Sequence, residues 1–390
     1  MVRTLQRMYI PGMMSFGPAL GWTFDIETPG AREAFEHFML TVTGPMNQPL
    51  AIVPAAPPKA IAALRLREVF EKWKAAKGHQ RTSDTVKARE RALVLFEEQS
   101  GDPPLHEITR AMGSEFSAWL VKQGGSSKTA ADRLTYVKSL LRYAARDLEL
   151  IPKNPWEGLT VEYRTEERRR PWTAEQVTHF FAQPLFSRYS LPARAKRAGA
   201  DAAYWIPLLG LFTGARVGEL CQLQSSDVIQ EQDVWCIDIN ESDDGKRLKT
   251  EASWRKVPIH SELIRLGFLD YAKTVKGAGY SSLWPALHLN EEKPSLGFSR
   301  WFNEGPRHAI AGVEIPDFHS LRHTVRSAMS AANVPEPDQD NITGHAVKGS
   351  TGTRVYRHVS MSKLRDAVES IRYPTFKLAR TYVSGTLTAT

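Results

Sequence analysis

The sequence is poor in cysteine and has no long apolar run. Its two cysteines, Cys221 and Cys236, lie among apolar neighbours, which argues against a disulfide framework and favours a reducing compartment. The most apolar stretch, residues 205–212, is broken by Pro207 and falls far short of the about 20 residues that a membrane helix needs. Residues 1–20 carry arginine, proline and glycine where a signal peptide has an apolar core. These absences predict a cytoplasmic protein without a membrane segment.

Metal and nucleotide signatures are absent as well. The sequence has no paired carboxylates at the spacing of a metal site and no G-x-x-x-x-G-K-S/T loop for nucleotide phosphates. We therefore expect no metal and no other cofactor. Positive charge, by contrast, is in excess, since 51 lysines and arginines against 43 aspartates and glutamates give a net charge of +8. This balance favours a polyanionic partner.

Proline sets off the first part of the chain. Residues 1–28 are rich in glycine, proline and aromatic residues without a clear period. Five prolines then make residues 43–59 a semi-rigid linker. We interpret residues 1–60 as an appendage with a linker, which packs on a neighbour or forms an oligomer contact. A short amphipathic helix is predicted within it from the spacing of Phe35, Phe38, Met39 and Val42.

Residues 61–150 predict four helices, because apolar residues recur at helical spacing throughout. The basic polar faces of these helices favour a DNA-binding domain, although a solvated helix surface is equally basic in many proteins. Residues 151–170 then form a charged strap, whose arginines suit a crossing of the DNA duplex but equally an ordinary linker. The candidate DNA contacts in these two segments are Lys87, Arg91, Lys128, Arg133, Lys138, Arg168, Arg169 and Arg170.

Residues 171–375 combine helices with a small antiparallel sheet, so the expected fold class is mainly α with an α+β second domain. A capping box of Thr173 and Gln176 predicts a helix start, and residues 201–212 predict a helix buried on all sides. Residues 376–390 form a β-prone tail. Strands are predicted at 234–239, 247–249 and 254–259, and helices at 261–276 and 298–311.

His319 and Arg322 indicate phosphate chemistry. They lie three positions apart on a predicted helix, so an imidazole and a guanidinium can face one anion, with His323 predicted off that face. Arg216 follows a glycine-flanked turn, from which the backbone can approach a ligand closely. Two guanidinium groups can then hold two oxygens of a phosphodiester. Glu219 is predicted to orient Arg216 rather than to react, because an unpaired guanidinium in a dry site is costly.

Together with Lys249 in Leu-Lys-Thr, His345 in Gly-His and Tyr356 before Arg-His, these residues resemble a known family, the tyrosine recombinases or phage-type integrases. The active site of that family carries Arg, Lys, His, Arg, His or Trp, and Tyr in this order. The resemblance covers residues 171–372 and also 62–150. It implies a helical core-binding domain and a catalytic domain that form a clamp around DNA. It implies the catalytic set Arg216, Lys249, His319, Arg322, His345 and Tyr356.

The resemblance also implies a mechanism. Tyr356 attacks the scissile phosphate with His319 as its base, which gives a 3′ phosphotyrosyl bond and a free 5′ hydroxyl. The two arginines and His345 stabilise the negative charge that develops, and Lys249 protonates the departing oxygen. Lys246 and Lys256 are rivals for the lysine, and Tyr373 is a rival for the tyrosine. Neither metal nor ATP is required, because the covalent bond conserves the energy of the phosphodiester.

The family further implies partners and location. These are double-stranded recombination sites, a homotetramer on two duplexes, accessory DNA-bending or directionality proteins, and a nucleoid-associated place in the cytoplasm. Residues 1–60 are then a variant DNA-binding module or the packing appendage. The tail 376–390 is either exchanged between subunits or disordered.

Two other functions fit the same residues. A type IB topoisomerase uses the same constellation to reseal the original strand, and a non-catalytic relative acts as an architectural DNA-binding protein. The order of the motifs and the two-domain layout argue against the topoisomerase, and the complete set of six residues argues against the non-catalytic relative. The additional amino-terminal segment favours the integrase of a mobile element. One departure from the family precedes Gly344, where residues 338–343 read Asp-Gln-Asp-Asn-Ile-Thr although apolar residues are usual.

Overall fold

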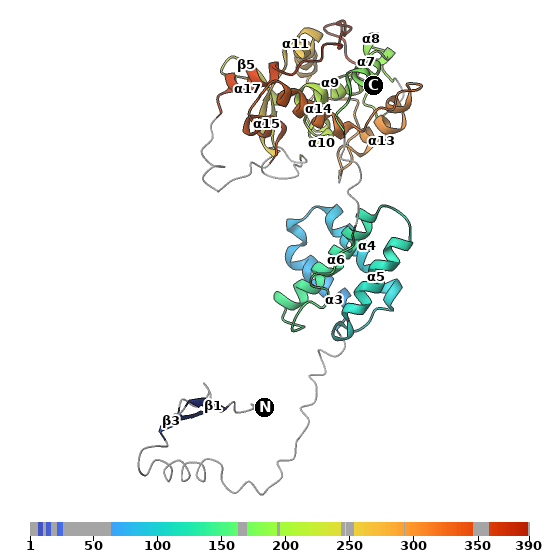
Figure 1. Cartoon of the computed structure of the whole chain (residues 1–390). Coiled ribbons are helices and arrows are strands. Elements are labelled where there is room, and N and C mark those ends of the chain that lie inside the picture. The colour runs from blue at the N-terminus through green and yellow to red at the C-terminus, as the bar shows by residue number, and fades with distance from the viewer. Residues whose placement is uncertain are drawn as a thin grey trace. The chain divides into compact units, whose positions relative to one another are not determined.

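The computed structural model describes residues 64–162, 170–192, 196–242, 246, 253–291, 293–345 and 359–388, and the backbone of residues 7–10, 13–16 and 22–25. The chain divides into two compact units, Met1–Glu162 and Tyr163–Thr390 (Figure 1). Within the described residues, helices dominate both units, and each unit has a three-stranded antiparallel sheet. The expected fold class, mainly helical with a small antiparallel sheet, is confirmed.

The first sheet was not expected from the sequence. Its strands β1 (Arg7–Ile10), β2 (Met13–Phe16) and β3 (Trp22–Asp25) pair in chain order, each antiparallel to the next. Glycine and aromatic residues are spaced irregularly in residues 1–28, so no periodic pattern predicted these strands. The amphipathic helix predicted from Phe35 to Val42 lies outside the described residues.

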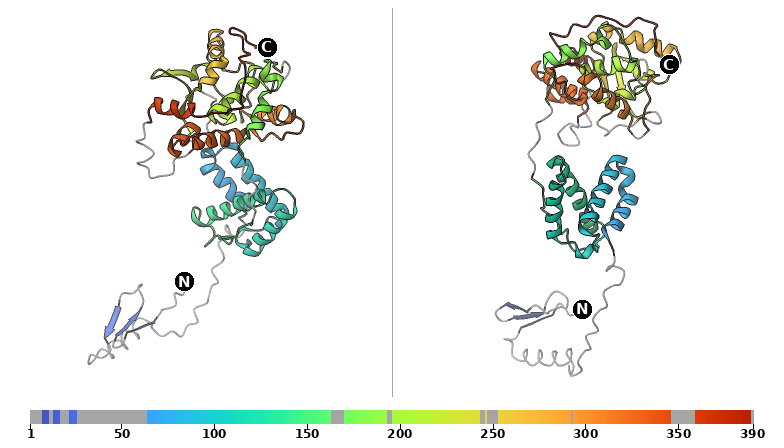
Figure 2. Two further views of the ribbon diagram at one scale, coloured as in Figure 1. Left: turned by 45° about the horizontal axis from the view of Figure 1, so that its top comes forward. Right: turned by 90° about the vertical axis from the view of Figure 1, so that its right-hand side faces the viewer.

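The four predicted helices of the first unit are present (Figure 2). Phe96, Phe116 and Trp156 meet in their core, with ring centroids 5.2 to 6.1 Å apart. Trp156 comes from the segment after the last helix, and its Nε1 donates a hydrogen bond to the Thr109 carbonyl at 2.9 Å. The helices are α3 (Leu66–Lys77), α4 (Ser83–Ser100), α5 (Arg110–Lys122) and α6 (Ser127–Arg146), with 3-10 turns η1 (Gly78–Gln80) and η2 (Leu105–Glu107).

The second unit is built around α9 (Asp201–Thr213). Every residue of this helix is buried, as its continuous apolar sequence predicted. The predicted capping box is also present, because Thr173 and Gln176 exchange hydrogen bonds at the start of α7. The other helices are α7 (Ala174–Phe181), α8 (Pro184–Ser187), α10 (Val217–Cys221), α11 (Ser261–Leu266), α12 (Phe268–Gly277), α13 (Leu296–Glu304), α14 (Phe318–Ala331), α15 (Glu336–Thr343) and α17 (Met361–Glu369), with 3-10 turns η3 (Ser225–Asp227) and η5 (Pro306–His308).

The second sheet differs in part from the prediction. Its strands β4 (Val228–Glu231), β5 (Val234–Ile239) and β6 (Arg255–Pro258) pair in that order, all antiparallel. Strand β4 was not predicted, and the expected strand at 247–249 lies outside the described residues. The helix predicted over 261–276 is interrupted at Gly267, where φ is +99° and one helix ends as the next begins.

The described part of the tail, residues 376–388, lies on its own unit. The Arg265 Nη2 donates to the Leu378 carbonyl at 2.7 Å, and the Leu378 and Tyr382 side chains are buried. Exchange of this tail between subunits stays a prediction. In the described ranges, none of the helices has the length and apolar composition needed to span a bilayer.

Candidate active site

Arg216 is presented by the turn after α9. The helix ends at Gly214 with φ of +63°, and a Cβ at this position would come within 3.2 Å of Thr343 and Val325. Glycine therefore serves both the left-handed backbone and the close approach of neighbouring elements. Arg216 follows at the N-cap of α10, and its Nη2 donates to the Gly344 carbonyl at 3.1 Å.

Glu219 joins two arginines, and one of them was not predicted from the sequence. Its Oε1 accepts from Arg216 Nη1 at 2.6 Å, and its Oε2 accepts from Arg255 Nη2 at 2.8 Å. Burial favours a raised pKa for the Glu219 carboxyl, but Arg255 and Arg216 outweigh it and lower this pKa below the ordinary value. Glu219 orients Arg216, as its i, i+3 spacing suggested.

Arg255 in β6 fixes the backbone that carries His345. Its Nε donates to the Ile342 carbonyl at 2.8 Å, and its side chain leaves no room for a Cβ at Gly344, which would lie 2.6 Å from Nη1. Gly344 also has φ of +68°. The Ser-x-Arg-x-Val-Pro run at residues 253–258 was the available signal for this residue.

Arg322 is almost fully buried. Its Nη1 donates to the Gly214 carbonyl at 2.9 Å, and its Nη2 lies 3.1 Å from His345 Nδ1. Among the described residues its Nε has no hydrogen-bond partner. Burial and the charges of Arg216 and Arg255 lower the pKa of Arg322 to about 9. The positive charge of Arg322 is therefore not fully compensated by its neighbours, which favours the binding of an anion beside it.

His345 is held as a neutral imidazole. Its Nδ1 lies 3.1 Å from both Arg322 Nη2 and Arg326 Nη1. The Thr343 hydroxyl lies closer, 2.8 Å from Nδ1, and can either donate or accept. Because arginine only donates, the two arginine contacts favour the tautomer in which Nδ1 accepts and Nε2 carries the ring proton. Burial, followed by the charges of Arg322 and Arg326, lowers the pKa of His345 to about 4. At neutral pH the Nε2–H group can thus donate to a ligand oxygen.

The polar departure before Gly344 has a structural role. Arg326 Nη1 donates to Asp340 Oδ1 at 2.6 Å and to Thr343 Oγ1 at 3.1 Å, so two of the unusual residues in α15 hold this arginine beside His345. Arg326 was not predicted from the sequence, although it lies one helical turn after Arg322 and so on the same face.

Of the three remaining catalytic candidates, the structure describes His319. His319 lies in the first turn of α14, where Asp317 caps the helix by accepting from the Ser320 amide. The expectation that His323 lies off the His319 face is wrong, since the two rings meet edge to face at 5.6 Å, as i, i+4 positions do. Lys249 and Tyr356 lie outside the described residues.

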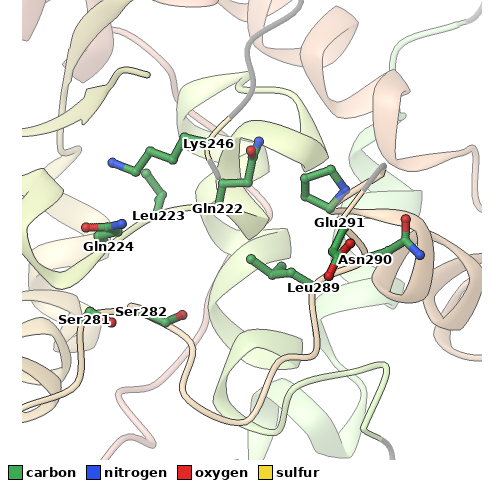
Figure 3. A pocket seen from close by; sticks show the side chains of 10 residues that line it. Gln222, Leu223, Gln224, Lys246, Ser281, Ser282, Leu289, Asn290 and Glu291 are labelled. Atoms are coloured by element: carbon green, nitrogen blue, oxygen red, sulfur yellow. The ribbon is translucent and has the colours of Figure 1, made fainter. Parts of the chain in front are cut away.

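The three rivals for the catalytic roles all have partners within the chain, and Lys256 forms an ion pair with Glu231. Lys246 Nζ binds Asp227 at 2.8 and 2.9 Å in a buried ion pair. It borders a cavity of about 460 Å³ whose lining combines amide and hydroxyl side chains with apolar and charged ones (Figure 3). The Tyr373 hydroxyl donates to the Leu211 carbonyl at 2.9 Å, and burial raises the pKa of Tyr373 far above its ordinary value. In the described part of the chain, no cluster of three or more His, Cys, Asp or Glu side chains could hold a metal.

The predicted DNA contacts differ in their surroundings. Lys87 and Arg91 are exposed on α4. Lys128 pairs with Asp132 at 3.2 Å, and Lys138 Nζ donates to the Leu159 carbonyl at 2.6 Å. Arg133 is half-buried in α6, Arg170 is exposed, and Arg168 and Arg169 lie outside the described residues.

Comparison with known proteins identifies the family. Residues 203–363 match the model of the phage integrase family, and residues 66–164 match that of the phage integrase SAM-like domain. The chain belongs to the phage integrase family of tyrosine recombinases, which are site-specific DNA recombinases.

Known relatives agree with this class. The chain is 24% identical over 279 residues to a XerC-like tyrosine recombinase of Caldanaerobacter subterraneus subsp. tengcongensis, which covers 65% of this chain and 68% of that protein. Its fold is similar to that of the Tn1549 transposon integrase in complex with circular intermediate DNA, with a TM-score of 0.54, 20% identity and coverage of 78% and 99% of the two chains. It is also similar to a lambda integrase dimer bound to a COC′ core site, with a TM-score of 0.51, 17% identity and coverage of 78% and 96%.

Proposed function

We propose that this protein is the integrase of a mobile element, which cleaves and rejoins DNA through a 3′ phosphotyrosyl bond at Tyr356. The observation that carries this proposal is the cluster of Arg216, Arg322 and His345, in which two guanidinium groups and one neutral imidazole are held close together. A phosphodiester fits this cluster, because its two non-bridging oxygens share a negative charge that can pair with the two guanidinium groups.

In the proposed cleavage step, the Tyr356 oxygen bonds to phosphorus, and the bond from phosphorus to the 5′ oxygen breaks. Tyrosine has an ordinary pKa of roughly 10, so its hydroxyl must lose its proton during attack, and His319 is the proposed base. Arg216, Arg322 and the Nε2–H of His345 stabilise the charge on the phosphorane. Lys249 gives its proton to the departing oxygen.

Rejoining reverses these steps with a 5′ hydroxyl from a second duplex. The bond energy is conserved in the phosphotyrosine, so we propose that the reaction needs neither metal nor ATP. Exchange between two duplexes calls for a homotetramer, a proposal supported by the lambda integrase tetramer bound to a Holliday junction, which has a TM-score of 0.50 to this chain. Accessory DNA-bending proteins and a nucleoid location complete the proposal.

We propose a separate function for each of the two units. Residues 61–150 form the core-binding domain and 171–375 the catalytic domain. Of the predicted linker 151–170, Ile151 and Trp156 pack into the core of the first unit. We propose that residues 1–60 are an appendage to this pair.

A nicked suicide substrate carrying the recombination site next to the gene tests the function. We expect wild-type protein to form a covalent adduct on a denaturing gel, and Tyr356→Phe to form none. Tyr373→Phe is the matched control and should retain the adduct, because the Tyr373 hydroxyl is bound to a core carbonyl. An adduct from Tyr356→Phe would place the nucleophile elsewhere. Tight binding without an adduct from wild type would favour an architectural protein.

Type IB topoisomerase activity is the second candidate, because the same residues serve it. A Holliday junction separates the two functions. A recombinase resolves the junction into exchanged duplexes, whereas a topoisomerase relaxes supercoiled plasmid and leaves the junction unexchanged.

A further inference from the structure

One guanidinium of the first unit lies over an aromatic ring, with a second ring nearby. The Cζ of Arg89, in α4, lies 4.0 Å from the ring centre of Trp73 in α3 and 5.8 Å from that of Tyr136 in α6. Such stacking fixes the plane of a guanidinium and leaves its edge available for hydrogen bonds. Arg89 is therefore preorganised on the surface that three helices share.

This guanidinium has no acidic partner within the described part of the chain. Its Nε is buried without a hydrogen bond. Burial lowers the pKa of Arg89, the nearby charge of Arg81 lowers it further, and no carboxylate opposes them. By contrast, Arg67 in the same bundle donates to Glu97 at 2.9 Å, and this bond raises the pKa of Arg67. Arg81, the exposed residue that caps η1, likewise forms no ion pair among the described residues, and two such cations favour an anion beside them.

We propose that Arg81 and Arg89 form a binding site for one phosphate of the DNA backbone. The proposal rests on the proposed DNA-binding function and names a contact of the core-binding domain that the charge pattern alone did not single out. Arg89 supplies a rigid donor edge, and the exposed Arg81 closes on the phosphate from η1.

The salt dependence of DNA binding tests this site. Full-length protein is titrated with duplex DNA of unrelated sequence at several salt concentrations, because phosphate contacts do not depend on sequence. Loss of one phosphate contact reduces the slope of log K against log salt by about 0.9. We expect this reduction for Arg81→Gln and not for Arg67→Gln, whose guanidinium is already neutralised by Glu97.

Arg89→Lys adds a second variant, since lysine keeps the charge but cannot stack as a planar group. We expect weaker binding with an unchanged slope. Equal slopes for wild type and Arg81→Gln, or an equal loss in Arg67→Gln, would overturn the site. Neither outcome touches the proposed function, which stands or falls on the Tyr356 adduct.

A second observation, in the other unit, concerns Arg326 and Asp340. We propose that this pair positions His345, because Arg326 faces Nδ1 of the imidazole at 3.1 Å and Asp340 fixes Arg326 at 2.6 Å. The pair acts through His345 and does not itself touch the phosphate. It thereby keeps the Nε2 proton directed to the proposed reaction centre.

Asp340→Asn removes the charge that anchors Arg326 and changes the side chain little in size. The matched control is Glu336→Gln, since Glu336 lies 3.9 Å from Arg326 and its side chain is 73% exposed. We expect Asp340→Asn to slow adduct formation by about 10- to 100-fold, as small misplacements of catalytic groups do. Glu336→Gln should leave the rate unchanged, and DNA affinity should be unchanged in both.

A readout independent of catalysis is the titration of His345 by NMR with labelled histidine. Burial lowers the pKa of His345 most, and the charged groups that act on it are Arg322, Arg326, Asp340 and Arg216. Loss of the Arg326 charge in Arg326→Gln should move the pKa of His345 upward from about 4 toward its ordinary 6.5. Arg326→Lys, which keeps the charge, should restore most of the low value. An unchanged titration in Arg326→Gln, or a normal adduct rate in Asp340→Asn, would overturn the positioning role.

Discussion

Neutralising Glu219 should destabilise the second unit more than any surface carboxylate does. In Glu219→Gln, the two charge-assisted hydrogen bonds to Arg216 and Arg255, at 2.6 and 2.8 Å, lose their charge. The Glu219 side chain is only 4% exposed and that of Arg255 only 6%. Removing one partner of such a buried pair costs about 3–5 kcal/mol. The loss should fall on the transition of residues 163–390 alone.

The direction of the Glu219 pKa shift determines how the stability difference between wild type and Glu219→Gln changes with pH. The folded pKa of Glu219 lies below its ordinary value of 4.5, so its stabilisation is fully present above that value and is lost as the pH falls through the folded pKa. The difference in unfolding free energy between wild type and Glu219→Gln should therefore be full at neutral pH and shrink in acid.

Urea unfolding of the full chain, followed by circular dichroism at neutral and acidic pH, measures this difference. Glu231→Gln is the matched control, because Glu231 pairs with Lys256 and both side chains are about a third exposed or more. Such a pair contributes less than about 1 kcal/mol. The stabilising role of the buried Glu219 ion pairs would be refuted if Glu219→Gln lowered the unfolding free energy no more than Glu231→Gln does. It would also be refuted if the loss of unfolding free energy did not depend on pH.

Three further changes follow from the site. Arg322→Lys should lower the rate of adduct formation by about 100- to 1000-fold with DNA affinity little changed, because it removes a preorganised donor; a rate within threefold of wild type on the suicide substrate would contradict this. Gly344→Ala should lower the thermal midpoint, at a cost of about 1–3 kcal/mol, because φ is +68° and the new Cβ would meet Arg255; an unchanged midpoint would oppose it. Lys246→Met should cost about 3–5 kcal/mol in urea by leaving Asp227 unpaired, yet the folded variant should form adduct at the normal rate, and loss of the adduct would restore Lys246 as the catalytic lysine.

Local patterns carried most of the fold prediction. Apolar spacing defined the four helices of the first unit, and the Thr173 capping box set the start of α7, because these signals lie within a few residues of one another. Strand β4 was missed since its four residues have too short an alternation to stand out. The break at Gly267 was missed because a single glycine is also tolerated within a helix.

The site was predictable where its residues belong to one motif. Glu219 lies one helical turn from Arg216, so its role followed from spacing. Arg255 and Arg326 were missed because their partners come from other elements, namely α10 and α15, and tertiary packing alone brings them together. The polar residues before Gly344 did signal a difference, but only the contact between Asp340 and Arg326 gives its physical reason.

The central claim is that Tyr356 becomes covalently bound to DNA. Adduct from the suicide substrate can be trimmed with nuclease, digested with Lys-C endoproteinase and analysed by mass spectrometry. Cleavage after lysine yields residues 349–363, which contain Tyr356, and residues 364–377, which contain Tyr373. If Tyr356 is the nucleophile, we expect nucleotide mass on the first peptide alone. Nucleotide mass on the second peptide, or on neither, would contradict it.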